Sequence, residues 1–116
     1  MILDHDRVQD LTRNNTKLIA SISQLFLAEL PDMIRSVEKA YEQSDRKSLS
    51  IAIHRLKSAV GNFAVKSFYE QFSRLELLAL GNNAPVMPLS DWLNEWDTTK
   101  AQLNTMVIEL KDMAGI

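Results

Sequence analysis

Apolar residues recur at intervals of three and four along most of the chain, the spacing that places them on one face of an α-helix. No run of alternating apolar and polar residues is long enough to predict a β-strand. The expected helices cover residues 6–12, 16–42, 46–61, 66–80 and 89–113. Four long amphipathic helices with short connections predict an all-α fold, an antiparallel four-helix bundle with a short extra N-terminal helix.

The same spacing predicts which side chains point inward. In the short first helix we expect Val8 and Leu11 to do so. The apolar stripe of the second helix consists of Ile19, Ile22, Phe26, Leu30, Met33, Val37 and Tyr41. The fourth and last helices carry Phe68, Phe72, Leu75 and Ala79, and Leu89, Trp92, Leu93, Trp96, Leu103, Val107 and Leu110. Pro31 interrupts the second stripe, and because the stripe continues past it we expect a kink rather than a restarted helix.

Capping residues mark several helix ends. Asp4 or Asp6 is a candidate N-cap for the first helix, and Ser44 or Asp45 for the third. Gly81 stands where a glycine commonly ends a helix. Turn-forming residues concentrate between positions 80 and 88, which predicts the connection between the last two helices there.

Length and composition fit one domain spanning residues 1–116. The chain is 46% hydrophobic and 24% charged, the balance of a soluble globular protein, and it has no cysteine. Thirteen basic against fifteen acidic residues argue against a nucleic-acid-binding face. No apolar run approaches the roughly 18 residues of a membrane span, and the polar N-terminus is not a signal peptide. We therefore expect a cytoplasmic protein without direct membrane insertion.

One of the two histidines, His54, is predicted to point outward. With Leu56 as the centre of the inward face of the third helix, His54 lies roughly 160° away on the helical wheel. Lys57 follows three residues later, so its side chain is a surface neighbour of the imidazole. A lone histidine on a helix surface is usually idle, and a lysine at this spacing is equally ordinary, so this pair alone does not establish a site.

The surroundings of His54 have low relief. Ser50, Ser58 and Gly61 lie on its side of the wheel, and Ile51 is an apolar residue on that outward side. Small side chains would let another protein approach the imidazole. A glycine inside a helix costs about 1 kcal/mol relative to alanine, although Gly61 could simply mark the helix end.

The fourth helix offers a partner for the imidazole. If the intervening turn centres near Val65, antiparallel pairing places His54 level with Glu76. A carboxylate there could accept a hydrogen bond from one ring nitrogen and determine which nitrogen stays free. Alternatively, Glu76 belongs to the solvated edge of its helix beside Arg74.

Several other kinds of site are disfavoured. The chain has no glycine-rich nucleotide loop and no set of kinase motifs, so ATP use is not expected. Neither His5 nor His54 has a glutamate three residues before it, which argues against a di-iron bundle site. We expect no metal site and no intrinsic cofactor.

The segment HRLKSAVGNFA resembles the histidine-containing phosphotransfer (HPt) domains of bacterial phosphorelays. Their pattern is a histidine, an aliphatic residue at +2, a lysine at +3, small residues at +4 to +6, and glycine or alanine near +10. The matching residues are His54, Leu56, Lys57, Ser58, Ala59 and Ala64. The segments LFLAELPDMIRSVEKA and RLE resemble the preceding and following helices, and LD at positions 3–4 resembles the usual start.

Two positions depart from the family pattern. The family often has glycine where Ser58 stands, and Val60 is larger than the residue often found there, although the wheel places it inward. The segment DWLNEW looks most like modules at the C-terminal end of tripartite hybrid sensor kinases, so the domain could be the cytoplasmic end of an inner-membrane sensor.

The resemblance implies a covalent phosphoryl carrier without kinase activity of its own. His54 would be the phosphorylated nucleophile, reacting through Nε2, with Lys57 stabilising the phosphoryl group and Glu76 holding the ring. It would accept the group from a receiver-domain aspartate and pass it to another. The docking surface for response-regulator receivers would comprise Ser50, Ile51, Ser58 and Gly61. The receiver would supply a divalent metal ion, and the isolated domain is expected to be a monomer.

Two other functions stay open at this point. The chain could be a helical adaptor that docks receivers or other proteins without being phosphorylated. It could also be a dimeric bundle that docks receivers as a kinase dimerisation module does.

Overall fold

A computed structural model of the chain describes residues 1–81 and 86–116. Its helices are α1 (His5–Thr12), α2 (Thr16–Glu42), α3 (Arg46–Val60), α4 (Lys66–Leu80) and α5 (Leu89–Ala114). Each predicted boundary lies within one residue of the observed one, and the described residues contain no strand, so the all-α prediction is confirmed. Part of the connection predicted at 80–88 lies outside the described residues.

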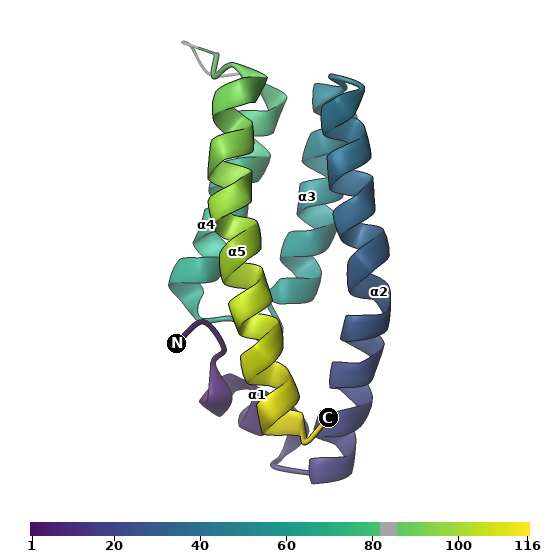
Figure 1. Cartoon of the computed structure of the whole chain (residues 1–116). Helices are drawn as coiled ribbons and strands as arrows, with labels where there is room; N and C mark the ends of the chain where they lie inside the picture. The colour runs from purple at the N-terminus through teal and green to yellow at the C-terminus, as the bar shows by residue number, and fades with distance from the viewer. Residues whose placement is uncertain (82–85) are drawn as a thin grey trace.

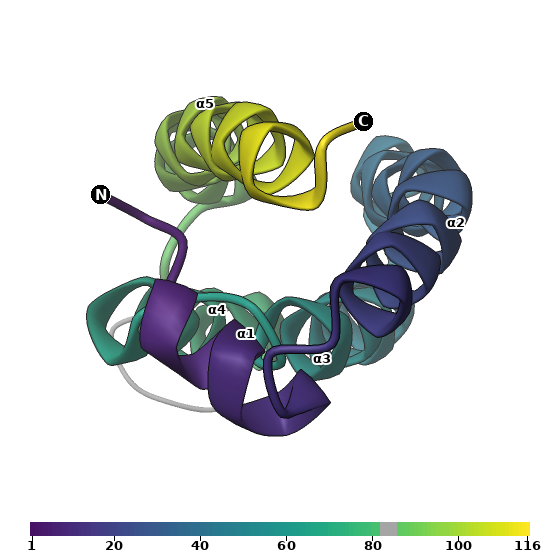
Figure 2. The same cartoon turned by 90° about the horizontal axis from the view of Figure 1, so that it is seen from below.

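The four long helices run alongside one another, and α1 lies across one end of them (Figure 1). Viewed along the bundle, α2, α3, α4 and α5 surround a common centre, and α2 also contacts α5 (Figure 2). The molecule is elongated, with extents of 46 × 23 × 19 Å.

The N-terminal segment is attached to the turn between α3 and α4. The backbone N–H of Asp4 donates to the Phe63 carbonyl at 2.8 Å, and that of Val65 donates to the Ile2 carbonyl at 2.9 Å. Leu3 is buried between these bonds and pairs with Ala64. The turn that sets the register of α3 against α4 is therefore held by hydrogen bonds to the N-terminal segment as well as by its own backbone hydrogen bonds.

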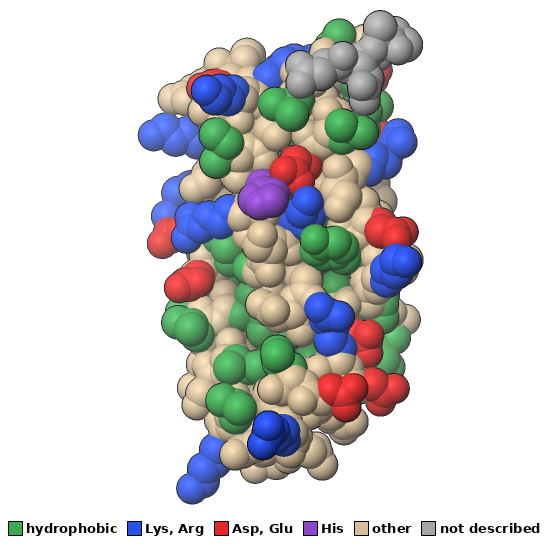
Figure 3. All heavy atoms as spheres, turned by 180° about the vertical axis from the view of Figure 1, so that it is seen from behind, with side chains coloured by type: hydrophobic (Ala, Val, Ile, Leu, Met, Phe, Trp, Pro, Cys, Tyr) green, Lys and Arg blue, Asp and Glu red, His purple; other side chains and the backbone are tan. Residues whose placement is uncertain are grey.

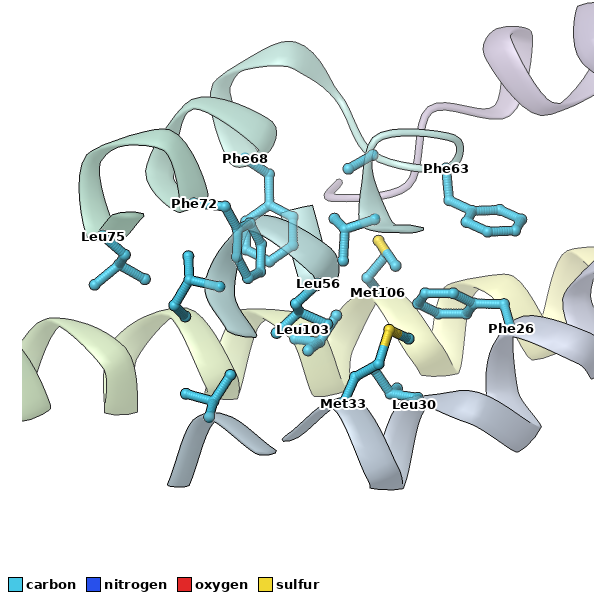
Figure 4. Packing of buried hydrophobic residues seen from close by; sticks show 14 of the residues in the cluster. Phe26, Leu30, Met33, Leu56, Phe63, Phe68, Phe72, Leu75, Leu103 and Met106 are labelled. Carbon is cyan, nitrogen blue, oxygen red and sulfur yellow. The ribbon is translucent and has the colours of Figure 1, made fainter. Parts of the chain in front are cut away.

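The bundle centre is filled by the apolar stripes that the sequence predicts, and Figure 4 shows part of this packing around Leu56. Both tryptophans are fully buried and their indole N–H groups have acceptors. Trp92 Nε1 donates to the Leu75 carbonyl at 3.0 Å, and Trp96 Nε1 donates to Glu38 Oε2 at 3.3 Å. Satisfied indoles add apolar burial without leaving a polar group unpaired.

Glu38 also accepts a hydrogen bond from Lys100, which connects α2 to α5 near the buried tryptophan. The Lys100 Nζ–Glu38 Oε2 distance is 2.8 Å. This hydrogen bond, with help from Trp96 and from the lysine charge, holds the pKa of Glu38 below its usual value although burial acts in the opposite direction. The carboxylate is therefore ionised at neutral pH.

One inward prediction for α1 is wrong. Leu11 is 56% exposed, whereas Val8 and Thr12 are buried. The short helix contacts α2 through a narrow strip, and residues four apart share that strip, so Thr12 rather than Leu11 follows Val8 inward. The Thr12 hydroxyl donates to the Val8 carbonyl at 2.7 Å, which satisfies it in the buried position.

The predicted caps are present. Asp4 Oδ1 accepts from the Arg7 N–H at 3.0 Å, and Asp45 Oδ1 accepts from the Ser48 N–H at 3.1 Å. Gly81 follows α4 with a φ of +69°, a left-handed conformation that favours glycine. Pro31 lies inside an uninterrupted α2, so the helix does not restart there. No helix among the described residues is long and apolar enough to cross a membrane.

Candidate functional site

His54 and Glu76 meet across the α3–α4 hairpin. The distance between His54 Nδ1 and Glu76 Oε2 is 2.8 Å, as the antiparallel register predicts. The His54 side chain is 61% exposed, while that of Glu76 is 23% exposed. The imidazole is therefore exposed on the surface, and its Nδ1 atom is held by the less exposed Glu76 carboxylate.

Lys57 binds the other oxygen of the same carboxylate. Its Nζ donates to Glu76 Oε1 at 2.6 Å, and its side chain is only 15% exposed. The sequence placed Lys57 beside His54, and the structure adds that Glu76 bridges the two. Figure 3 shows this face, where the purple histidine lies beside an acidic side chain and has basic side chains on either side of it.

The protonation state of Glu76 determines which imidazole nitrogen is free. Partial burial raises the pKa of Glu76, but the hydrogen bonds and charges of Lys57 and His54 outweigh burial and hold the pKa below its usual value. An ionised carboxylate only accepts hydrogen bonds, so His54 Nδ1 carries the hydrogen. Nε2 of the neutral ring then has an unshared electron pair and faces away from Glu76.

The four candidate docking residues have different surroundings. Ile51 is 61% exposed and Ser58 is exposed, with its hydroxyl donating to the His54 carbonyl at 3.0 Å. Gly61 is half-buried at the end of α3. Outside the helix contact, the candidate surface therefore has one apolar side chain, one small hydroxyl side chain and a glycine.

Ser50 corrects the sequence-based picture of that surface. It is only 6% exposed, and its hydroxyl donates to the Glu76 carbonyl at 3.4 Å. The helical wheel gave its direction correctly, but α4 packs over that side of α3. Ser50 therefore belongs to the contact between the two helices rather than to the exposed surface.

Sequence reasoning overlooked Tyr69, which lies on α4 next to the site. The Lys57 Nζ lies 5.8 Å from the centroid of its ring, within range of a cation–π contact. The register that aligns His54 with Glu76 also places position 69 opposite Gly61, so the contact could have been predicted from the same pairing.

Among the described residues, no three or more histidine, cysteine, aspartate or glutamate side chains form a group that could hold a metal ion. The chemistry of the site rests on an exposed imidazole, a carboxylate and an ammonium group.

An α-helical bundle with an exposed histidine and a lysine at +3 has the features that the resemblance to helical phosphotransfer domains leads us to expect. A family model described as the Hpt domain matches residues 21–113, which is most of the chain. The chain therefore belongs to the Hpt domain family. Comparisons with curated proteins and with solved structures gave no match.

Membership gives the general function. Hpt domains are phosphocarrier modules of two-component phosphorelays, in which a histidine carries the phosphoryl group and receiver domains are the interacting partners. They are not kinases. The resemblance to a module of a tripartite hybrid kinase remains a prediction.

Proposed function

We propose that His54 accepts a phosphoryl group from the phosphorylated aspartate of one receiver domain and passes it to an aspartate of another. The Nε2 electron pair attacks phosphorus, and an N–P bond forms as the P–O bond to aspartate breaks. The bonding pair of the broken bond stays on the departing carboxylate. In the second step an aspartate oxygen of the acceptor attacks phosphorus, and the N–P electrons return to the imidazole.

Glu76 is proposed to orient the ring and balance its charge. Bonding of Nε2 to phosphorus leaves a positive charge on the imidazole, while Nδ1 keeps its hydrogen. The Glu76 carboxylate, 2.8 Å from Nδ1, is placed to stabilise that charge. This single contact, made by a histidine side chain that is 61% exposed, is the observation that best supports the proposal.

Lys57 is proposed to stabilise the phosphoryl oxygens. It follows His54 by about one helical turn and carries a compact positive charge at the end of its side chain. Transfer of a phosphoryl group depends largely on positioning and on neutralising the oxygens, so a nearby ammonium group suits this role. The receiver would contribute a divalent metal ion, and the domain itself would use no cofactor and no ATP.

The receiver is proposed to dock over Ile51, Ser58 and Gly61. Ile51 offers apolar area near the imidazole, and the two smaller residues allow close approach. Nucleic acid is not a proposed partner, because the net charge is −2. We expect the domain to act as a monomer, and sedimentation showing a dimer that buries His54 would contradict this.

The test is incubation of the protein with a receiver domain phosphorylated by radiolabelled acetyl phosphate. The protein should acquire label that is labile in acid and stable in base, the behaviour of a phosphoramidate. His54→Gln should abolish labelling, whereas His5→Gln on α1 should not. Binding of the receiver without any labelling of the wild-type protein would favour the non-phosphorylated adaptor instead. Label that persists in folded His54→Gln protein would show that the site is elsewhere.

A further inference from the structure

Tyr69 packs its ring on Gly61 at the end of α3. The φ of Gly61 is −59°, an ordinary right-handed value, so its backbone conformation does not require glycine. A Cβ atom added there would lie 2.9 Å from Cε2 and 3.1 Å from Cδ2 of the Tyr69 ring. Glycine at position 61 therefore allows the close approach of this ring.

The same ring lies beside the Lys57 ammonium group. Nζ is 5.8 Å from the ring centroid and 2.6 Å from Glu76 Oε1, so the cation is held by an aromatic ring and by a carboxylate. An ammonium group has three N–H donors, and the carboxylate oxygen takes one of them. The ring attracts the cation through its π face and leaves the remaining donors usable by a phosphoryl oxygen.

We propose that Tyr69 is a positioning residue that holds Lys57 for reaction at His54. A free lysine side chain samples many rotamers, and fixing it during transfer costs conformational entropy. The Tyr69 ring restricts these rotamers beforehand and keeps the ammonium group in place while its remaining N–H donors bind phosphoryl oxygens. This role rests on the proposed transfer through His54 and goes beyond it, since Tyr69 would act through Lys57.

The test compares Tyr69→Leu with Tyr69→Phe as the conservative control. Transfer from a receiver labelled with radioactive acetyl phosphate is followed over a range of receiver concentrations. Tyr69→Leu should lower the maximal transfer rate about two- to fivefold, the effect of a cation–π contact at a partly exposed site, and leave the half-saturating concentration unchanged. Tyr69→Phe should retain the wild-type rate because it keeps the ring.

A double-mutant cycle with Lys57→Ala separates positioning from a general structural effect. If Tyr69 acts through Lys57, Tyr69→Leu should cause no further loss in the Lys57→Ala background. An equal loss in both backgrounds, or a change in the half-saturating concentration alone, would overturn the proposal. Should Tyr69→Leu fail to fold, Gly61→Ala is the second variant, because the added methyl group pushes the Tyr69 ring away from its position without removing the ring. A wild-type maximal transfer rate in Gly61→Ala would count against the role of Tyr69.

The outcomes also distinguish this role from the underlying transfer. Labelled wild-type protein together with a Tyr69→Leu variant that transfers equally fast would refute only the role of Tyr69. Absence of label on the wild-type protein would refute transfer through His54, and the role of Tyr69 with it.

Discussion

Removing the Glu76 carboxylate is expected to slow phosphoryl transfer to His54 about tenfold. In the folded protein this carboxylate lies 2.8 Å from His54 Nδ1 and 2.6 Å from Lys57 Nζ. A hydrogen bond to a charged group contributes about 1.5–3 kcal/mol. Because the imidazole is 61% exposed, we take the lower value of about 1.5 kcal/mol, which corresponds to roughly a tenfold change in rate.

The matched series is Glu76→Ala, Glu76→Gln and Glu70→Ala. Glutamine keeps a carbonyl oxygen for His54 Nδ1 but loses the charge that also binds Lys57, so we expect a loss of about two- to threefold. Glu70 lies on the same helix in an exposed pair, 3.7 Å from the Lys66 Nζ, and its removal should leave transfer unchanged. The assay is the single-turnover transfer rate at saturating phosphorylated receiver, with circular dichroism melting as the folding control.

The melting data address a second effect of Glu76→Ala. Lys57 is only 15% exposed and loses its carboxylate partner in this variant, so we expect a loss of about 1 kcal/mol of stability and a melting temperature lower by about 4 °C. A folded Glu76→Ala protein that transfers at the wild-type rate would refute the orienting role of the carboxylate. Equal slowing by Glu70→Ala would show that the effect is not specific to the His54 contact.

Three further predictions concern docking, the core and pH. Ile51→Asp should raise the half-saturating receiver concentration at least several-fold, because it places a charge in a proposed apolar contact. The control is Ile108→Asp on α5, where the side chain is 69% exposed, and it should leave this concentration unchanged. Equal effects of the two substitutions would refute docking at Ile51. Leu56→Ala should lower the free energy of unfolding by about 2–5 kcal/mol in urea titrations, since Leu56 is fully buried, and a loss below 1 kcal/mol would contradict its place in the core. The pKa values of Glu38 and Glu76 are lower in the folded than in the unfolded protein. The stability that these residues contribute is therefore present above a pH of about 4.5 and is lost as the pH falls through their folded-state pKa values. Urea unfolding midpoints that did not fall with pH in this acidic range would contradict these shifts.

The helices and most of the core could be predicted from the sequence because their causes are local. Three- and four-residue spacing fixes which side of a helix is apolar, and the capping side chains Asp4 and Asp45 act within three residues of themselves. The outward direction of His54 follows from the same spacing. Its alignment with Glu76 required one further assumption, the position of the turn, and antiparallel helices then pair at fixed intervals.

What lies beside each of these side chains was decided by the tertiary structure. Ser50 points along the side of α3 that the wheel indicates, yet it is buried because α4 covers that side. Lys57 shares Glu76 with His54 and lies near the Tyr69 ring because the α3–α4 register brings those groups together. In the long helices the sequence by itself determined which side chains point inward and which point outward, since helix geometry repeats along the chain, whereas in the short α1 it misplaced Leu11. Only the packing of one helix on another determined which side chains are covered and which charges meet, because these contacts join residues far apart in the chain.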